Sequence, residues 1–161
     1  MKTIKIYLAP TVQKVHKEIL NSQGEPFVSS RYVTVPSKKN QQQAIVSKST
    51  GKSFIKQSEQ YVNWKKLTYP FFHNEANRII QETGITRIIR AKMKIIFYFP
   101  DYLPRDLTNK SESIMDALVE SKIIYDDKFQ VSNKIWLEGY ICKNRPRTEI
   151  YIHIIDPEST E

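Results

Sequence analysis

The sequence predicts a mixed α+β domain in which two principal helices pack on a small mixed sheet. Runs rich in β-branched and aromatic residues predict the strands, apolar residues at helical spacing predict the helices, and prolines and glycines separate them. The 161 residues are 40% hydrophobic and 26% charged, which suits one soluble domain with its own core. Two full domains would be cramped at this length.

The first part of the chain is expected to form a strand, a helix and a second strand. Residues 1–8 alternate between apolar and polar side chains, as a strand with one buried face does. After Pro10, residues 12–20 place apolar side chains at helical spacing, so we expect a helix that Gly24 ends. Residues 31–36 are β-rich and close on a proline, which predicts a strand that stops there.

A hairpin and the first long helix are expected next. Residues 44–48 and 53–56 are short β-like runs on either side of a Ser-Thr-Gly-Lys turn. Ser58 is suited to cap the helix that follows, because its hydroxyl can accept a hydrogen bond from a free backbone N–H. Pro70 should kink or restart this helix, and Gly84 should end it.

The second half predicts three strands and a short amphipathic helix. Residues 87–100 form the strongest strand pattern and end at a proline. Residues 134–142 and 148–155 are expected to form two further strands around a basic turn. Between these regions, Thr108 or Asn109 can cap a helix. Its core-facing side chains should be Ile114, Met115, Leu118 and Val119.

The balance of charge points to a polyanionic partner. Lysine and arginine outnumber aspartate and glutamate by 25 to 17, which gives a formal net charge of +8. Carboxylates gather between Asp106 and Asp127, where they would repel a polyanion unless a hard divalent cation lay between them. A basic chain with such a group is typical of a metal-dependent enzyme that acts on phosphodiesters. A solvated basic face alone would give the same net charge.

The cysteine count, the apolar runs and the histidine spacing limit the cellular compartment and the kind of metal site that we expect. The single cysteine, Cys142, excludes an intramolecular disulfide framework and fits a reducing compartment. No apolar run approaches the roughly 20 residues of a membrane span, and no secretion signal opens the chain. We therefore expect a cytoplasmic protein. The three histidines are scattered and do not have the spacing of zinc ligands.

Three short motifs and one upstream segment resemble the RusA-like family of Holliday junction resolvases, which are crossover junction endodeoxyribonucleases. In order along the chain, the motifs are Asp106-Leu107-Thr108-Asn109, Asp116-Ala117-Leu118 and Asp126-Asp127. Upstream, Val35-Pro36-Ser37-Lys38-Lys39-Asn40 is similar to the family's Pro-Ser-x-x-Asn strand end. We interpret residues 29–156 as a RusA-like endonuclease domain, residues 1–28 as an N-terminal extension and residues 157–161 as a tail.

The resemblance implies a homodimeric, magnesium-dependent endonuclease that resolves four-way DNA junctions in recombination and repair. The resemblance also implies that Mn²⁺ can replace Mg²⁺. On this basis Asp106 and Asp127 match the family's metal-binding aspartates and would also be catalytic. The family's usual setting is the cytoplasm of bacteria, often in phage or prophage DNA. Because a helix of about 12 residues spans about 18 Å, the two aspartates can meet only if the chain doubles back after the helix.

The chain departs from the family at two positions. Thr108 stands where the family has a second aspartate, and Glu112 stands where it has a lysine. We hypothesise that Glu112, one helical turn beyond Thr108, supplies the missing carboxylate, with Asp126 as a further auxiliary ligand. Lys110 or the lysines of the upstream segment would then supply the lost positive charge. The alternative is a catalytically inactive protein that binds branched DNA.

DNA contacts are expected from two loops and from the start of the acidic helix, and each acidic residue also has a structural alternative. Asp106 and Asn109 could act only as a helix cap, Glu112 could be a solvated first-turn carboxylate, and Asp126 with Asp127 could form an ordinary turn. Asp116 fits a structural role better than a ligand's. The expected DNA-binding residues are Lys38, Lys39, Asn40, Asn109, Lys110, Lys143, Arg145 and Arg147.

Overall fold

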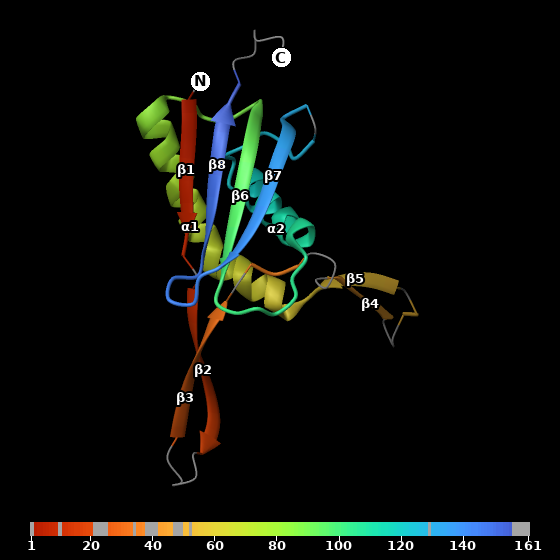
Figure 1. Ribbon diagram of the computed structural model, residues 1–161. Helices are drawn as coiled ribbons and strands as arrows, with labels where there is room; N and C mark the ends of the chain where they lie inside the picture. The colour runs from red at the N-terminus through yellow and green to blue at the C-terminus, as the bar shows by residue number, and fades with distance from the viewer. Residues whose placement is uncertain are drawn as a thin grey trace.

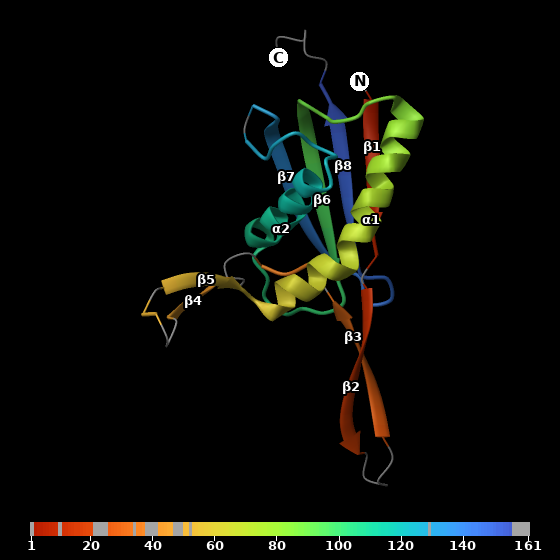
Figure 2. The ribbon, with the colours of Figure 1, turned by 180° about the vertical axis from the view of Figure 1, so that it is seen from behind.

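In the computed structural model, a four-stranded sheet carries two helices on one of its faces (Figure 1, Figure 2). The structure describes residues 2–9, 11–20, 26–33, 35–37, 42–46, 50–51, 53–128 and 130–155. In spatial order, the sheet contains β1 (Lys2–Leu8), β8 (Arg147–Ile154), β6 (Ala91–Phe99) and β7 (Ser132–Ile141). β8 is antiparallel to β1 and β6, whereas β6 and β7 are parallel. The predicted α+β class and mixed sheet are confirmed.

The first helix, α1 (Glu59–Thr83), has the limits that its capping residues predict. The Ser58 hydroxyl accepts a hydrogen bond from the backbone N–H of Tyr61 at 3.3 Å. Gly84 ends the helix with a φ of +72°, a left-handed conformation that glycine adopts at little cost. Pro70 lies inside the helix and does not interrupt it. Figure 2 shows the axis of α1 bending along its length, as a proline inside a helix is expected to cause.

The second helix, α2 (Leu107–Glu120), connects the two parallel strands β6 and β7. Its predicted apolar stripe faces the core, with Ile114, Met115 and Leu118 buried and Val119 partly buried. Together with α1 it covers the inner face of the sheet (Figure 2). The largest fully buried side chains include Trp64, Phe72, Ile6, Met93, Ile95, Phe97, Ile114, Leu118, Ile150 and Ile152.

The chain leaves α2 through a tight turn that returns it to the core. Lys122 has a φ of +64°, and the N–H of Ile123 donates to the carbonyl of Leu118 at 3.0 Å. Ile124 then forms an isolated parallel bridge with Ile88. Ile88 was expected to lie in the long strand, but β6 begins only at Ala91, because Ile88 pairs with this turn instead.

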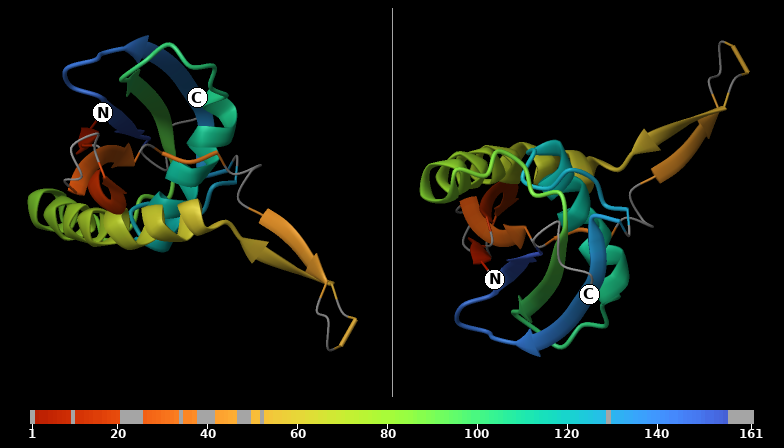
Figure 3. Two further views of the ribbon diagram at one scale, coloured as in Figure 1. Left: turned by 90° about the horizontal axis from the view of Figure 1, so that it is seen from below. Right: turned by 90° about the horizontal axis from the view of Figure 1, so that it is seen from above.

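Two hairpins extend away from the sheet, as Figure 1 and Figure 3 show. The first pairs β2 (Thr11–Leu20) with β3 (Pro26–Val33), and the second pairs β4 (Gln42–Val46) with β5 (Ser53–Gln57). The second was predicted. Its turn includes Gly51, whose φ is +67°. No helix in the described part of the chain combines the length and apolar character of a membrane span.

The predicted helix over residues 12–20 is wrong, because this segment is the strand β2. The pairing of β2 with β3 shifts register between Val15 and Ile19. Such an irregularity interrupts the alternation of a strand, so apolar residues on its two sides fall at a helix-like spacing. The strand predicted over residues 31–36 is also displaced, since β3 ends at Val33. Gly24 lies outside the described residues.

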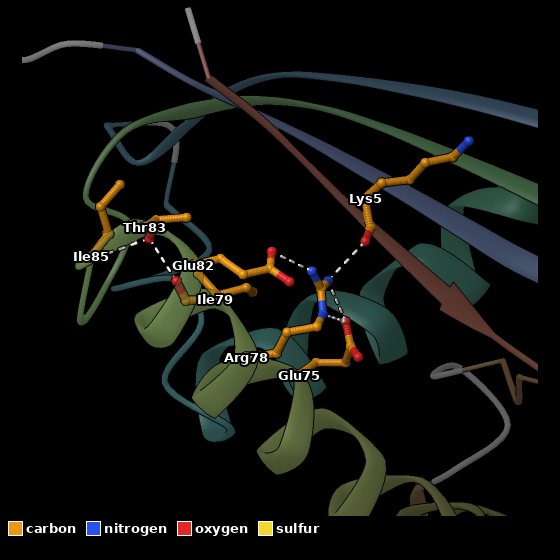
Figure 4. A network of polar contacts seen from close by, with 7 residues as sticks. All are labelled: Lys5, Glu75, Arg78, Ile79, Glu82, Thr83 and Ile85. Atoms are coloured by element: carbon orange, nitrogen blue, oxygen red, sulfur yellow. Dashed lines mark hydrogen bonds and ion pairs between the residues drawn. The ribbon is translucent and has the colours of Figure 1, made fainter.

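The N-terminal strand belongs to the main sheet. All seven residues of β1 pair with β8, and Ile4, Ile6 and Leu8 are part of the core. Figure 4 shows how α1 holds this edge strand: Arg78 donates to the carbonyl of Lys5 at 3.0 Å while its guanidinium pairs with Glu75 and Glu82. The boundary that we expected between residues 28 and 29 therefore falls inside β3, and the tail at residues 157–161 lies outside the described residues.

Candidate functional site

Asp106 is the N-cap of α2, which is the structural alternative that the sequence offered for it, whereas Thr108 and Asn109, also expected as caps, lie inside the helix. Its carboxylate accepts hydrogen bonds from the backbone N–H of Asn109 at 3.1 Å and from the Asn109 side-chain amide at 2.5 Å. A carboxylate at this position also interacts favourably with the positive end of the helix dipole. Asp106 is nevertheless exposed, whereas Asn109 is buried against it.

The other residues of interest on α2 point in different directions. Thr108 and Glu112 are both exposed, one helical turn apart. Asp116 is partly buried and accepts a hydrogen bond from the Tyr61 hydroxyl of α1 at 3.3 Å. This contact links the two helices. Burial of the Tyr61 hydroxyl, together with the neighbouring carboxylate, raises the pKa of Tyr61.

Asp126 and Asp127 form part of the turn that precedes β7. One Asp126 oxygen accepts hydrogen bonds from the N–H groups of Asp127 and Lys128 at 2.8 and 3.3 Å. The other lies 3.0 Å from the ammonium of Lys128. The hydrogen bond from Lys128 is the main cause that lowers the pKa of Asp126. Asp127 is exposed.

The two acidic groups lie at opposite ends of α2. The helix has 14 residues, which corresponds to a length of about 21 Å. Leu107, at the start of the helix, lies over Gly139 of β7, since a β-carbon added to Gly139 would be 3.3 Å from the Leu107 methyl groups. Gly139 pairs with Phe97, near the end of β6. Asp127 instead lies near the beginning of β6, where the N–H of Ala91 donates to Val131 at 2.7 Å.

The chain therefore does not double back to the start of α2, and the expected convergence of Asp106 with Asp127 does not occur within one chain. Oxygen ligands lie about 2.0–2.6 Å from a bound Mg²⁺ or Ca²⁺, so carboxylates at opposite ends of this helix do not share one ion. The described part of the chain contains no group of three or more histidine, cysteine, aspartate or glutamate residues placed to hold a metal. Among the described residues, Asp106 and Asp127 of one chain therefore lie too far apart to hold one ion together.

The upstream Val-Pro-Ser segment does meet the acidic helix. The Lys110 ammonium donates a hydrogen bond to the carbonyl of Val35, and the Ser113 hydroxyl donates to the carbonyl of Pro36 at 2.9 Å. Burial, with a smaller effect of the nearby Arg105, lowers the pKa of Lys110 to about 8. Lys110, an expected DNA contact, is thus directed into the protein. Lys38, Lys39 and Asn40 lie outside the described residues.

The basic turn between β7 and β8 lies at the same end of the sheet as the start of α2. Lys143 and Arg145 are exposed, and the Lys143 ammonium lies 6.0 Å from the centre of the Tyr102 ring, in the loop that precedes Asp106. Arg147 is held by other groups: its Nε donates to Glu149 at 2.6 Å, and its guanidinium lies 3.6 Å from the centre of the Tyr98 ring.

A second surface was missed by the sequence analysis. It is the outer face of the sheet, where lysines and aromatic residues occupy three of four alternate positions on each of β6 and β7: Lys92, Lys94 and Tyr98, and Lys134, Trp136 and Tyr140. This period of two was the available signal. It was overlooked because the strands were assigned from their apolar residues.

The chain matches no protein-family model, and no curated protein is significantly similar to it in sequence. The resemblance to the RusA-like family therefore rests on the motifs and their spacing.

Proposed function

We propose that the protein is a RusA-like, metal-dependent endodeoxyribonuclease that binds and cuts branched DNA. The contact between the Val35-Pro36 carbonyls and α2 supports this proposal best, because it brings the upstream segment against the helix in which two of the other motifs lie, although 75 and 77 residues separate the bonded pairs. The net charge of +8 suits a partner rich in phosphates. The proposed setting is the bacterial cytoplasm, with the gene belonging either to the bacterium or to a phage or prophage.

We further propose that each metal site takes its carboxylates from two chains. Asp106 and Glu112 are exposed near one end of α2, and Asp127 is exposed beyond the other end. In a two-fold homodimer, a contact between Asp106 and Asp127 of the partner subunit is repeated once by symmetry. Such a dimer has two equivalent sites for Mg²⁺ or Mn²⁺, which suits the approximate two-fold symmetry of a four-way junction.

Mixing two inactive variants tests this arrangement. Asp106→Asn and Asp127→Asn should each abolish magnesium-dependent cleavage of a synthetic four-way junction. Asparagine also caps helices, so the first change removes the charge and keeps the cap. After subunit exchange, half of the dimers would contain one chain of each kind, and one of their two sites would have both aspartates. The mixture should therefore recover about a quarter of the wild-type nicking activity.

Two results would contradict this proposal in different ways. A mixture that stays inactive, although both variants are folded and exchange subunits, would show that the site is not shared between chains. Single variants that cut as well as the wild type would exclude both aspartates from catalysis. Glu112→Gln tests the remaining ligand: cleavage should fall, and unchanged cleavage would show that Glu112 does not replace the missing aspartate at position 108.

An inactive protein that binds branched DNA is the second candidate. It is favoured by Thr108 in place of a ligand and by the engagement of Asp106 in a helix cap. Gel-shift measurements in EDTA, compared with cleavage in Mg²⁺ and in Mn²⁺, separate the two. Tight binding without cutting under either metal would support the inactive protein.

A further inference from the structure

The outer face of the four-stranded sheet is left uncovered by the described part of the chain. Figure 1 shows the sheet in front of both helices, and Figure 2 shows both helices on the opposite side. Side chains alternate between the two faces of a strand. Ile4, Ile95 and Ile152 are buried under the helices, so the residues that precede and follow each of them along its strand point outward. We call this outward surface the open face.

Aromatic rings gather on the open face at positions in register. Tyr98 of β6 pairs with Tyr140 of β7, and their rings stack with centres 5.7 Å apart and planes 26° from parallel. In a second cross-strand row, Lys94 of β6 lies between Tyr151 of β8 and Trp136 of β7. Trp136 is 42% exposed and Tyr140 50% exposed. Their faces are therefore accessible for stacking.

The same face is basic. It has five lysine and arginine side chains and two glutamates, and each glutamate oxygen already has a partner. Glu138 pairs with Lys94 at 2.7 Å and accepts from the Tyr140 hydroxyl at 3.0 Å. Glu149 likewise pairs with an arginine and accepts from a tyrosine hydroxyl. The glutamates therefore orient the cations and rings, and each is paired with a cation of the same face.

Two lysines lie directly over rings of this face. The Lys5 ammonium is 4.7 Å from the centre of the Tyr7 ring and 4.9 Å from that of Tyr151. The Lys134 ammonium is 4.6 Å from the centre of the Trp136 ring. A base that stacks on such a ring would bring its phosphate close to an ammonium group. Stacking rings with interleaved cations are the two elements of a platform for single-stranded nucleic acid.

We propose that the open face binds single-stranded DNA, with bases stacked on Trp136 and Tyr140 and phosphates beside the lysines. Duplex DNA does not suit this surface, since its base faces are covered by their neighbours. A second copy of the chain would present the same excess of cations and be repelled. An oligoribonucleotide presents the same bases and phosphates, so the test compares the two sugars directly. The inference does not depend on the proposed nuclease, since none of the proposed metal ligands lies on this face.

The test is binding of a fluorescent twelve-residue oligothymidylate in EDTA, where metal-dependent cleavage does not contribute. Trp136→Ala and Tyr140→Ala should each weaken binding roughly five- to 150-fold, the range for losing one base–ring stack. Tyr125→Ala is the matched control, because Tyr125 is 56% exposed but lies in the turn after α2. Its affinity should remain that of the wild type. Lys134→Met should reduce the slope of log affinity against log salt by about 0.7.

Intrinsic fluorescence supplies a second measurement. Trp64 is 1% exposed and Trp136 is 42% exposed, so quenching by the oligonucleotide should come almost entirely from Trp136. Trp136→Phe should abolish the quenching while largely retaining affinity, since phenylalanine also stacks on bases.

Several outcomes would overturn the proposal. Unchanged affinity in Trp136→Ala and Tyr140→Ala would exclude the open face as the site. Tighter binding of a duplex or of an oligouridylate would exclude single-stranded DNA as the preferred ligand. A wild-type dimer that Tyr140→Ala converts to a monomer would identify this face as a contact between copies of the chain.

Discussion

Replacing Ser113 with alanine should selectively loosen the contact between α2 and the Val-Pro-Ser segment. Ser113 is fully buried, and its hydroxyl donates to the buried carbonyl of Pro36 at 2.9 Å. Without this donor the carbonyl remains buried and loses a partner, which costs about 1–3 kcal/mol of the free energy of unfolding. Alanine is the better helix former by a few tenths of a kcal/mol, which offsets a small part of the loss.

Ser111→Ala is a matched control on the same helix. Its hydroxyl is also buried but donates at 2.7 Å to the carbonyl of Thr108, within α2 itself. That carbonyl lies in the first turn and is expected to keep its helical N–H donor, so we expect a loss below about 1 kcal/mol. The difference between the two variants isolates the contact between α2 and the upstream segment.

Urea unfolding of both variants, with the slope m compared to exclude a change in the unfolded state, measures this difference. Amide hydrogen exchange adds a local measurement, since the N–H groups of Val35 and Ser37 should exchange faster only in Ser113→Ala. If both variants lost the same stability and showed equal exchange there, the hydrogen bond to Pro36 would not hold the segment.

Two other predictions concern stability. The pKa of Lys110 is lowered to about 8 from an ordinary value near 10.5. Between these two pH values the unfolded chain binds more protons at Lys110 than the folded protein does. The free energy of unfolding should therefore rise with pH over this range. Relative to Lys110→Met, which removes this titration, the free energy of unfolding of the wild type should rise by about 3 kcal/mol from pH 8 to 10.5; parallel pH profiles would refute the low pKa. Gly84→Ala should cost about 1 kcal/mol in urea unfolding, because φ is +72° and no neighbour lies within 4 Å of an added β-carbon; an unchanged midpoint would show that α1 can end without the left-handed residue.

Local signals in the sequence were sufficient where an element is defined by its own residues. Ser58 and Gly84 set the ends of α1, because a cap is formed by atoms a few residues apart. The alternation of residues 1–8 and the proline at position 100 likewise identified β1 and the end of β6. Local reasoning failed at residues 12–20, where a register shift in the hairpin imitates helical spacing.

The position of β1 at the edge of the main sheet could not be read locally. Its partner β8 lies about 150 residues further along the chain. The sequence of one strand alone does not specify which other strand it pairs with. The same holds for Lys110, which the sequence places on a basic, DNA-facing helix start. Only the docking of Val35 beside α2 shows why its ammonium is buried.

Local patterns in the sequence were enough to predict that acidic residues flank a short amphipathic helix, and that this helix packs through Ile114, Met115 and Leu118. Tertiary structure decided where those acidic residues lie. Because β6 and β7 are parallel, the chain must cross from one end of the sheet to the other between them, and α2 makes that crossing. Asp106 and Asp127 are therefore separated by the length of the helix. Strand pairing also created the open face, by placing every second residue of four distant strands on one surface.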